Sequence, residues 1–111
     1  MKTYILDGKK PVFEPDIIKW AQWYESADRV VRKSDFELVR DGTVVASASL
    51  ETVFLAIESI GYGGGKAMFE TALVWHGSSR HAREFRCVGD SWDEAEENHK
   101  NSCAAAFLGF R

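Results

Sequence analysis

Residues 36–57 read FELVRDGTVVASASLETVFLAI, and this stretch decides the fold. The dipeptide Asp41-Gly42 near its start favours a two-residue hairpin turn, because glycine adopts a positive φ angle without steric cost. Apolar residues precede the turn, and the segment Thr43–Ile57 that follows it is rich in β-branched residues. We therefore predict two antiparallel strands, of which the second is long and bulged.

Further strands are expected on both sides of this hairpin. Residues 2–6 are predicted to form a short strand and Phe69–Trp75 another. Charged and apolar residues alternate in Arg83–Val88, which is typical of a half-exposed or edge strand. The segment Gly61–Gly65 contains four glycines and is expected to form a loop. The residues expected on one face of the strand Phe69–Trp75 are Phe69, Thr71, Leu73 and Trp75.

Two amphipathic helices are predicted, one over residues 16–27 and one beginning at Trp92 and ending near Gly109. Pro15 suits the first helical position, and Ser91 with Glu94 forms a capping box at the start of the second helix. The expected inward-facing residues are Ile17, Trp20, Ala21, Tyr24 and Ala27 in the first helix and Trp92, Ala95, His99, Cys103 and Ala106 in the second.

These elements predict an α+β fold in a single domain, residues 1–111. The expected order is β-α-β-β-β-β-α, since consecutive strands joined by short turns form antiparallel pairs. We expect a sheet of about four to five strands with both helices on one face, which is a two-layer arrangement.

The amino-acid composition argues against several classes of function. Fourteen basic and seventeen acidic residues give a net charge of −3, which argues against nucleic-acid binding because that affinity comes largely from Lys and Arg. No apolar run reaches the roughly 20 residues that span a bilayer, and the start lacks the pattern of a signal peptide. Cys87 and Cys103 are expected to be reduced thiols, so we predict a protein of the cytoplasm. Because no apolar run is long enough to span a bilayer, we expect no membrane partner.

One candidate surface for protein contact combines an aromatic residue with acidic ones. Trp23 lies at the edge of the inward stripe of the first helix, where partial exposure would make it an anchor and burial would make it core. The acidic start of the second helix contains Asp93, Glu94 and Glu97, which are either a solvated, capped helix start or the complement of a basic groove.

An enzymatic alternative uses His99 and Glu70 as an acid/base pair. Histidine titrates near neutral pH, and Glu70 is unusual in a strand of mostly apolar residues. The plainer interpretation is a packed, hydrogen-bonded His99 and a Glu70 that faces water or an arginine.

A third hypothesis is a small-ligand or nucleotide site on the glycine loop. Gly63, Gly64, Gly65 and Lys66 resemble part of a phosphate-binding loop, but residue 60 is isoleucine and residue 67 is alanine, so the loop departs from the P-loop motif. The spacing of the histidines and cysteines does not match a metal site, and we expect neither a metal nor another cofactor.

Several short motifs together resemble small uncharacterised proteins encoded by tailed bacteriophages and bacterial prophages. The motifs are YILDGKKPV at residues 4–12, WAQWYESADR at 20–29, SLETVFL at 49–55, FET at 69–71 and DSWDEAEENH at 90–99. The chain departs from the family's pattern by extra residues at about 35–48 and by glycines where the family has a proline-rich loop before Phe69. The resemblance implies a phage setting and supplies no catalytic residues.

From these observations we expect a non-enzymatic phage or prophage accessory protein that binds an unidentified host or phage protein in the host bacterial cytoplasm. A host-modulating or anti-defence role would fit its small size and acidic charge. The small-ligand and enzyme hypotheses stay open, as does a homodimer formed by the middle strands or by the edge strand Arg83–Val88.

Overall fold

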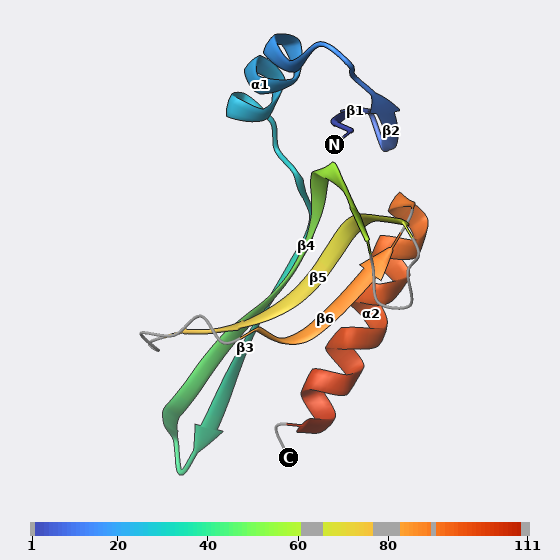
Figure 1. The fold of residues 1–111 in the computed structure, drawn as a ribbon. Helices are drawn as coiled ribbons and strands as arrows, with labels where there is room; N and C mark the ends of the chain where they lie inside the picture. Colours follow the sequence, from blue (N-terminus) through green and yellow to red (C-terminus); the bar gives the residue numbers. More distant parts are fainter. Residues whose placement is uncertain (1, 61–65, 77–82, 90, 110–111) are drawn as a thin grey trace.

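The computed structural model describes residues 2–60, 66–76, 83–89 and 91–109. Its elements are two helices and six strands, so the predicted α+β class is confirmed (Figure 1). In chain order they are β1 (Tyr4–Asp7), β2 (Lys10–Phe13), α1 (Ile17–Ser26), β3 (Val30–Arg40), β4 (Thr43–Ile60), β5 (Lys66–Trp75), β6 (Arg83–Gly89) and α2 (Trp92–Gly109).

The larger sheet has four strands in the order β3-β4-β5-β6, and every neighbouring pair is antiparallel. The helix α2 lies across one face of this sheet and contacts all four strands (Figure 1). Its start is capped as predicted, because the Oγ atom of Ser91 accepts a hydrogen bond from the backbone N–H of Glu94 at 3.2 Å.

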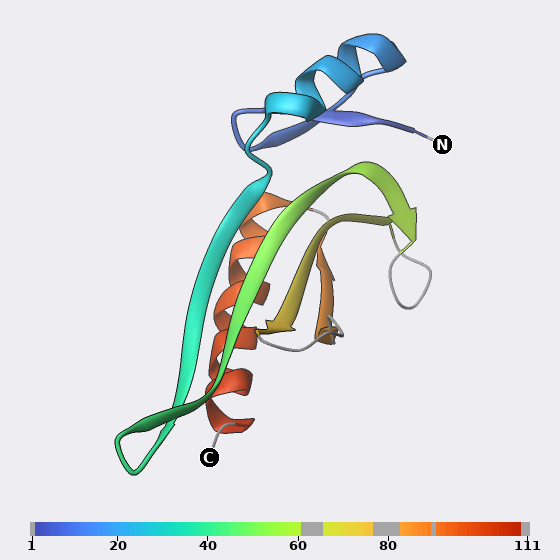
Figure 2. The same cartoon turned by 90° about the vertical axis from the view of Figure 1, so that its left-hand side faces the viewer.

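The predicted hairpin joins β3 and β4. Asp41 and Gly42 occupy its turn with φ angles of 51° and 75°, which is the conformation that this dipeptide favours. The strand β5 ends at Trp75, opposite Ala48, so the rest of the hairpin extends beyond the sheet (Figure 2). We call this projecting part, residues 38–46, the β-arm.

The strands β1 and β2 form a separate antiparallel hairpin, and α1 packs against it. This N-terminal unit, residues 2–26, sits at the end of the sheet opposite the β-arm (Figures 1 and 2). A bridge between Thr3 and Ile57 attaches it to β4. The indole N–H of Trp20 also donates to the carbonyl oxygens of Tyr4 and Ala56, both at 3.1 Å.

The structure differs from the predicted arrangement in two respects. The strand β2 was not predicted, because Lys10-Pro11 after the Asp7-Gly8 turn does not resemble a strand; proline is tolerated here in a hairpin of only two strands. Only α2 covers the four-stranded sheet, since α1 is held on the β1–β2 hairpin.

The buried face of α1 is also not the one predicted. Trp20 and Trp23 are half-buried against the core, whereas Ile17 and Ile18 are 59% and 67% exposed and Tyr24 is exposed as well. The helix is capped by Asp16, whose Oδ1 accepts from the N–H groups of Ile18 and Lys19, so Pro15 precedes the cap and is not the first helical residue. The tryptophans form the packed side of the helix, because Trp20 donates to backbone carbonyls of β1 and β4 and Trp23 packs against Phe54.

The core lies where α2, the sheet and the N-terminal unit meet. Phe54 is fully buried at its centre, with ring centroids 5.3 Å from Phe69 and 6.0 Å from Trp23. Just beyond Phe54, the strand β4 bends at the buried Ala56, which has a positive φ of 64°. The bend lies in an irregularity of register between Phe54 and Ser59, and it brings β4 to the N-terminal unit.

Candidate functional site

His99 lies at the centre of a buried polar ladder between α2 and the sheet. It is only 1% exposed, as the predicted inward stripe of the helix requires. Its Nε2 atom is 2.8 Å from the hydroxyl of Ser34, and its Nδ1 atom is 2.8 Å from the hydroxyl of Thr52. Thr52 is in turn 2.7 Å from the hydroxyl of Thr71 on β5. The ladder therefore joins α2 to β3, β4 and β5.

This arrangement favours a neutral imidazole. Burial lowers the pKa of His99 below its usual 6.5, and the positive charge of Arg32 lowers it further. Both ring nitrogens already have hydroxyl partners, so the geometry that the structure gives is that of a packed, hydrogen-bonded histidine.

Glu70 does not join this ladder. It precedes Thr71 in β5, and successive side chains of a strand point to opposite faces. Since Thr71 faces α2 through Thr52 and His99, Glu70 lies on the other face of the sheet, where it is buried. The structure therefore does not bring the two residues of the acid/base hypothesis together.

A second histidine cluster lies on the face of the sheet away from α2. The Nδ1 atom of His76 is 3.1 Å from the hydroxyl of Ser47, and its Nε2 atom is 2.7 Å from the hydroxyl of Ser49. Ser49 donates to the carboxylate of Asp35 at 2.5 Å. These residues were not predicted to form a site. In the sequence, Ser47 and Ser49 are visible only as two serines on the same face of a strand. Only the strand register shows that they lie beside His76 and Asp35.

The residues of the glycine-loop hypothesis are mostly outside the described part of the chain. Gly63, Gly64 and Gly65 lie in the segment 61–65, which the structure does not describe. Lys66 is the first residue of β5, but its side chain is outside the description too.

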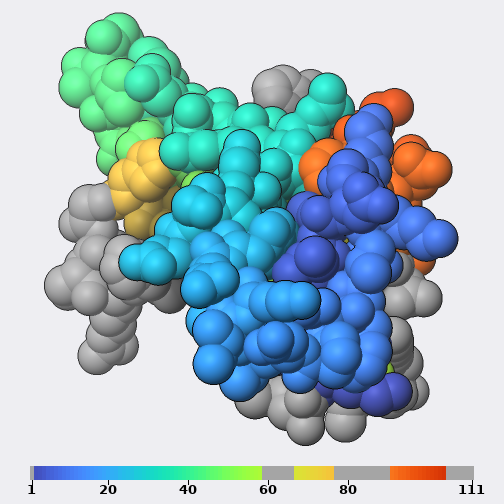
Figure 3. Space-filling view, turned by 90° about the horizontal axis from the view of Figure 1, so that it is seen from above, coloured from blue at the N-terminus to red at the C-terminus, as the bar shows by residue number. Residues whose placement is uncertain are grey.

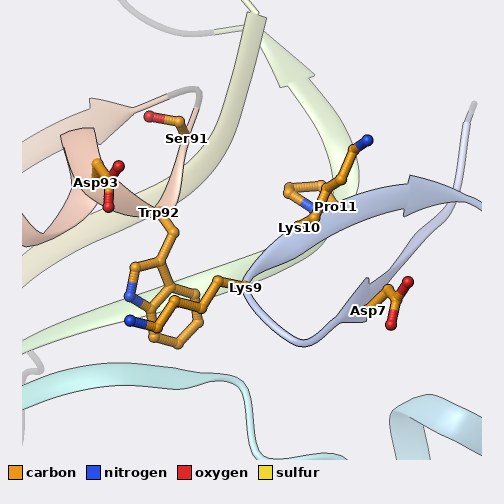
Figure 4. A pocket seen from close by; sticks show the side chains of 7 residues that line it. All are labelled: Asp7, Lys9, Lys10, Pro11, Ser91, Trp92 and Asp93. Carbon is orange, nitrogen blue, oxygen red and sulfur yellow. The ribbon is translucent and has the colours of Figure 1, made fainter.

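A surface pocket of about 410 Å³ lies between the β1–β2 turn and the start of α2. It is lined by Asp7, Lys9, Lys10, Pro11, Ser91, Trp92 and Asp93. Figure 4 shows the side chain of Lys9 alongside the Trp92 indole, and its Nζ atom is 5.8 Å from the ring centroid. The pocket joins two segments that are about 80 residues apart in the chain, which sequence spacing alone does not reveal.

The structure places the predicted protein-contact residues in two different environments. Trp23 is half-buried and packs its ring edge-on against Phe54, so it belongs to the core that holds α1 in place. Asp93, Glu94 and Glu97 are exposed on the first turns of α2. The predicted anchor, Trp23, is therefore part of the core, whereas the three acidic residues are accessible to a partner.

More exposed apolar residues lie at the junction of β2 and α1. Phe13 is 49% exposed, and Ile17 and Ile18 are the most exposed of the large hydrophobic residues that the structure describes. We call these three residues the N-terminal apolar surface. The sequence analysis placed Ile17 in the core because it follows the helical period of Trp20 and Tyr24.

The cysteines and potential metal ligands form no further site in the described ranges. Cys103 is a free thiol packed beside Leu73 and Leu50, and the side chain of Cys87 is outside the described part. Among the side chains that the structure describes, those of residues 2–58, 67–76 and 91–104, no three from His, Cys, Asp or Glu gather as they would around a metal ion.

Comparisons of the chain with protein-family models, with curated proteins and with solved structures found no match. Neither helix in the described part of the chain is long and apolar enough to cross a membrane.

Proposed function

We propose that this chain is a non-enzymatic binding protein that recognises another protein through its N-terminal apolar surface. The observation that carries the proposal is the exposure of Phe13, Ile17 and Ile18. The N-terminal segment that carries them is blue in Figure 3 and faces the viewer there. Apolar side chains grouped on a small domain typically mark interaction sites, because their burial in a partner is favourable.

The chemistry around the surface suggests the kind of partner. Glu14 and Asp16 flank the three apolar residues in the chain. We therefore propose a partner protein with an apolar groove bordered by basic residues, which would be attracted to the acidic rim.

The biological setting is proposed from the resemblance to small phage and prophage proteins. In that setting the partner is a host or phage protein of the bacterial cytoplasm, and the role is to modulate the host or to counter its defence. This part of the proposal rests on the sequence motifs and not on the geometry of the surface.

The test is affinity capture of the tagged protein from bacterial lysate after a high-salt wash, followed by titration of the purified partner. We expect one stoichiometric partner for the wild type, with binding at least tenfold weaker for Ile18→Glu, because a charge would enter an apolar contact. Ala104→Glu introduces the same charge on an exposed residue of α2 and is the matched control, which should bind as the wild type does. Equal binding by Ile18→Glu would contradict the proposal.

A second candidate function, small-ligand binding, is favoured by the pocket beside Trp92. Its volume of about 410 Å³ is within the range of ligand sites, and its lining sets the amines of Lys9 and Lys10 beside the carboxylates of Asp7 and Asp93. On this alternative, ATP at tenfold its dissociation constant stabilises the protein by about 1.4 kcal/mol, which raises Tm by on the order of 5 °C. Lys9→Glu should abolish the shift and Lys19→Glu should keep it; flat melting curves across a nucleotide panel would reject the alternative.

A further inference from the structure

We propose that two copies of this chain form an antiparallel dimer through their β3 strands, in a register centred on Ser34. The strand β3 lies at the edge of the four-stranded sheet, where β4 is its only partner among the strands that the structure describes. Figure 2 shows β3 running along the left-hand edge of the sheet from α1 to the β-arm. An edge strand of eleven residues offers a row of backbone groups to a further strand.

Symmetry limits the registers that such a dimer can adopt. A two-fold axis perpendicular to the sheet keeps each side chain on its own face, and residues opposite each other in a sheet share a face. The axis must therefore pass beside a single residue of β3, so that residue pairs with its own copy.

The charges of β3 select one of these registers. Lys33 and Asp35 flank Ser34 on the face away from α2, and both are exposed. An axis at Ser34 places each Lys33 opposite Asp35 of the second copy, which makes two attractive pairs. An axis at Lys33 opposes two lysines, and one at Asp35 opposes two aspartates. Charged residues on an edge commonly discourage pairing, but an axis at Ser34 sets opposite charges against each other, unlike an axis at Lys33 or Asp35.

The same register brings together apolar residues that a single chain leaves exposed. Arg32 is opposite Phe36 of the second copy, and the regular pairing ends there because the register of β3 shifts between Val30 and Arg32. The β-arm therefore continues past the start of that copy's β3. Four further residues of a strand reach about 13 Å, towards the C-terminal end of α1. The β-arm carries the exposed Val39, Val44 and Val45, and the receiving end carries the exposed Val30 and Tyr24.

This dimer leaves the N-terminal apolar surface out of the contact. Ile17 and Ile18 are at the first turn of α1, and the proposed contact is at its last turn. Self-association and partner binding therefore use different ends of α1, and either can fail in experiment without the other.

The test is the mass of the full-length chain in solution, measured by sedimentation velocity over a concentration series. We expect a dimer for the wild type. Lys33→Asp and Asp35→Lys should each weaken it roughly tenfold or more, because each replaces two attractive pairs by two repulsive ones. Lys10→Asp makes the same charge change as Lys33→Asp on an exposed residue away from β3 and should leave the dimer unchanged.

Mixing the two single variants provides the decisive step. Lys33→Asp and Asp35→Lys chains are complementary to each other at both pairs, so an equimolar mixture should form a heterodimer although each variant alone is weakened. A wild type that stays a monomer at 100 times the concentration used for circular dichroism would overturn the proposal. So would a mixture that behaves as the sum of its weakened components, since that result would assign any dimer to another surface.

Discussion

Replacing Phe54 by alanine is expected to lower the free energy of unfolding by about 3–5 kcal/mol. Phe54 is fully buried and touches both Phe69 from the sheet and Trp23 from α1, so its removal leaves a cavity where three parts of the molecule meet. The free energy of unfolding of a domain of this size is only about 5–15 kcal/mol, so this single change is expected to remove a large part of it. Urea unfolding followed by tryptophan fluorescence measures it.

The matched control for Phe54→Ala is Val44→Ala. Val44 also lies in β4, but it is on the β-arm and about half exposed, so its truncation should cost less than about 1 kcal/mol. A loss below about 1 kcal/mol for Phe54→Ala would mean that the N-terminal unit and the sheet are not joined through this residue.

Acid is expected to destabilise the fold through His99. The pKa of His99 is lowered in the folded state by burial and by Arg32, whereas in the unfolded chain it is near 6.5. The unfolded state therefore binds more protons below about pH 6.5, and stability falls as the pH drops from that value towards the folded-state pKa. Above about pH 7 this contribution is fully present.

His99→Leu should remove this part of the pH dependence. At pH 7.5 the variant should also be less stable by about 1–3 kcal/mol, because the half-buried hydroxyl of Ser34 loses its ring-nitrogen partner and the buried hydroxyl of Thr52 keeps only Thr71. His76→Gln changes an exposed histidine and should keep the acid-induced loss that His99 causes. Urea unfolding at several pH values between 5 and 8 measures both effects. If His99→Leu loses stability in acid as steeply as the wild type, the assignment to His99 is wrong.

Local signals account for the parts of the fold that the sequence predicted. Asp41-Gly42 forms the hairpin turn, and Ser91 caps α2, because each depends on the conformational preferences of neighbouring residues. The helical spacing of Ala95 and His99 also predicted the buried face of α2. The alternation in Phe69–Trp75 predicted which residues share the face towards α2, although Met68, Glu70 and Ala72 on the other face are buried too.

The N-terminal unit shows where these signals fail. The helical period of Ile17, Trp20 and Tyr24 indicates one apolar stripe, but periodicity cannot say what lies opposite the helix. Contacts with β1, β4 and Phe54 bury Trp20 and Trp23 in part, whereas Ile17 is exposed. Tertiary packing decided which side of the helix is buried.

The partners of His99 could not be predicted for a related reason. Its place on the inward face of α2 follows from helical spacing, but Ser34 and Thr52 are 65 and 47 residues away in the chain. Only the register of β3 and β4 and the position of α2 across them bring the three side chains together. The same register places Glu70 on the opposite face. The alternation within the strand predicts that Glu70 and Thr71 lie on different faces, but it does not predict which of these faces His99 contacts.

The proposal that the N-terminal apolar surface binds a protein is tested most directly by amide hydrogen exchange with and without the captured partner. The account predicts slower exchange in the partner-bound state at residues 13–20, where Phe13, Ile17 and Ile18 lie. Exchange in the turn at Asp41-Gly42 should be unchanged, since the β-arm is at the other end of the molecule (Figure 1). Protection confined to α2 or β6, with residues 13–20 exchanging as in the free protein, would contradict the account.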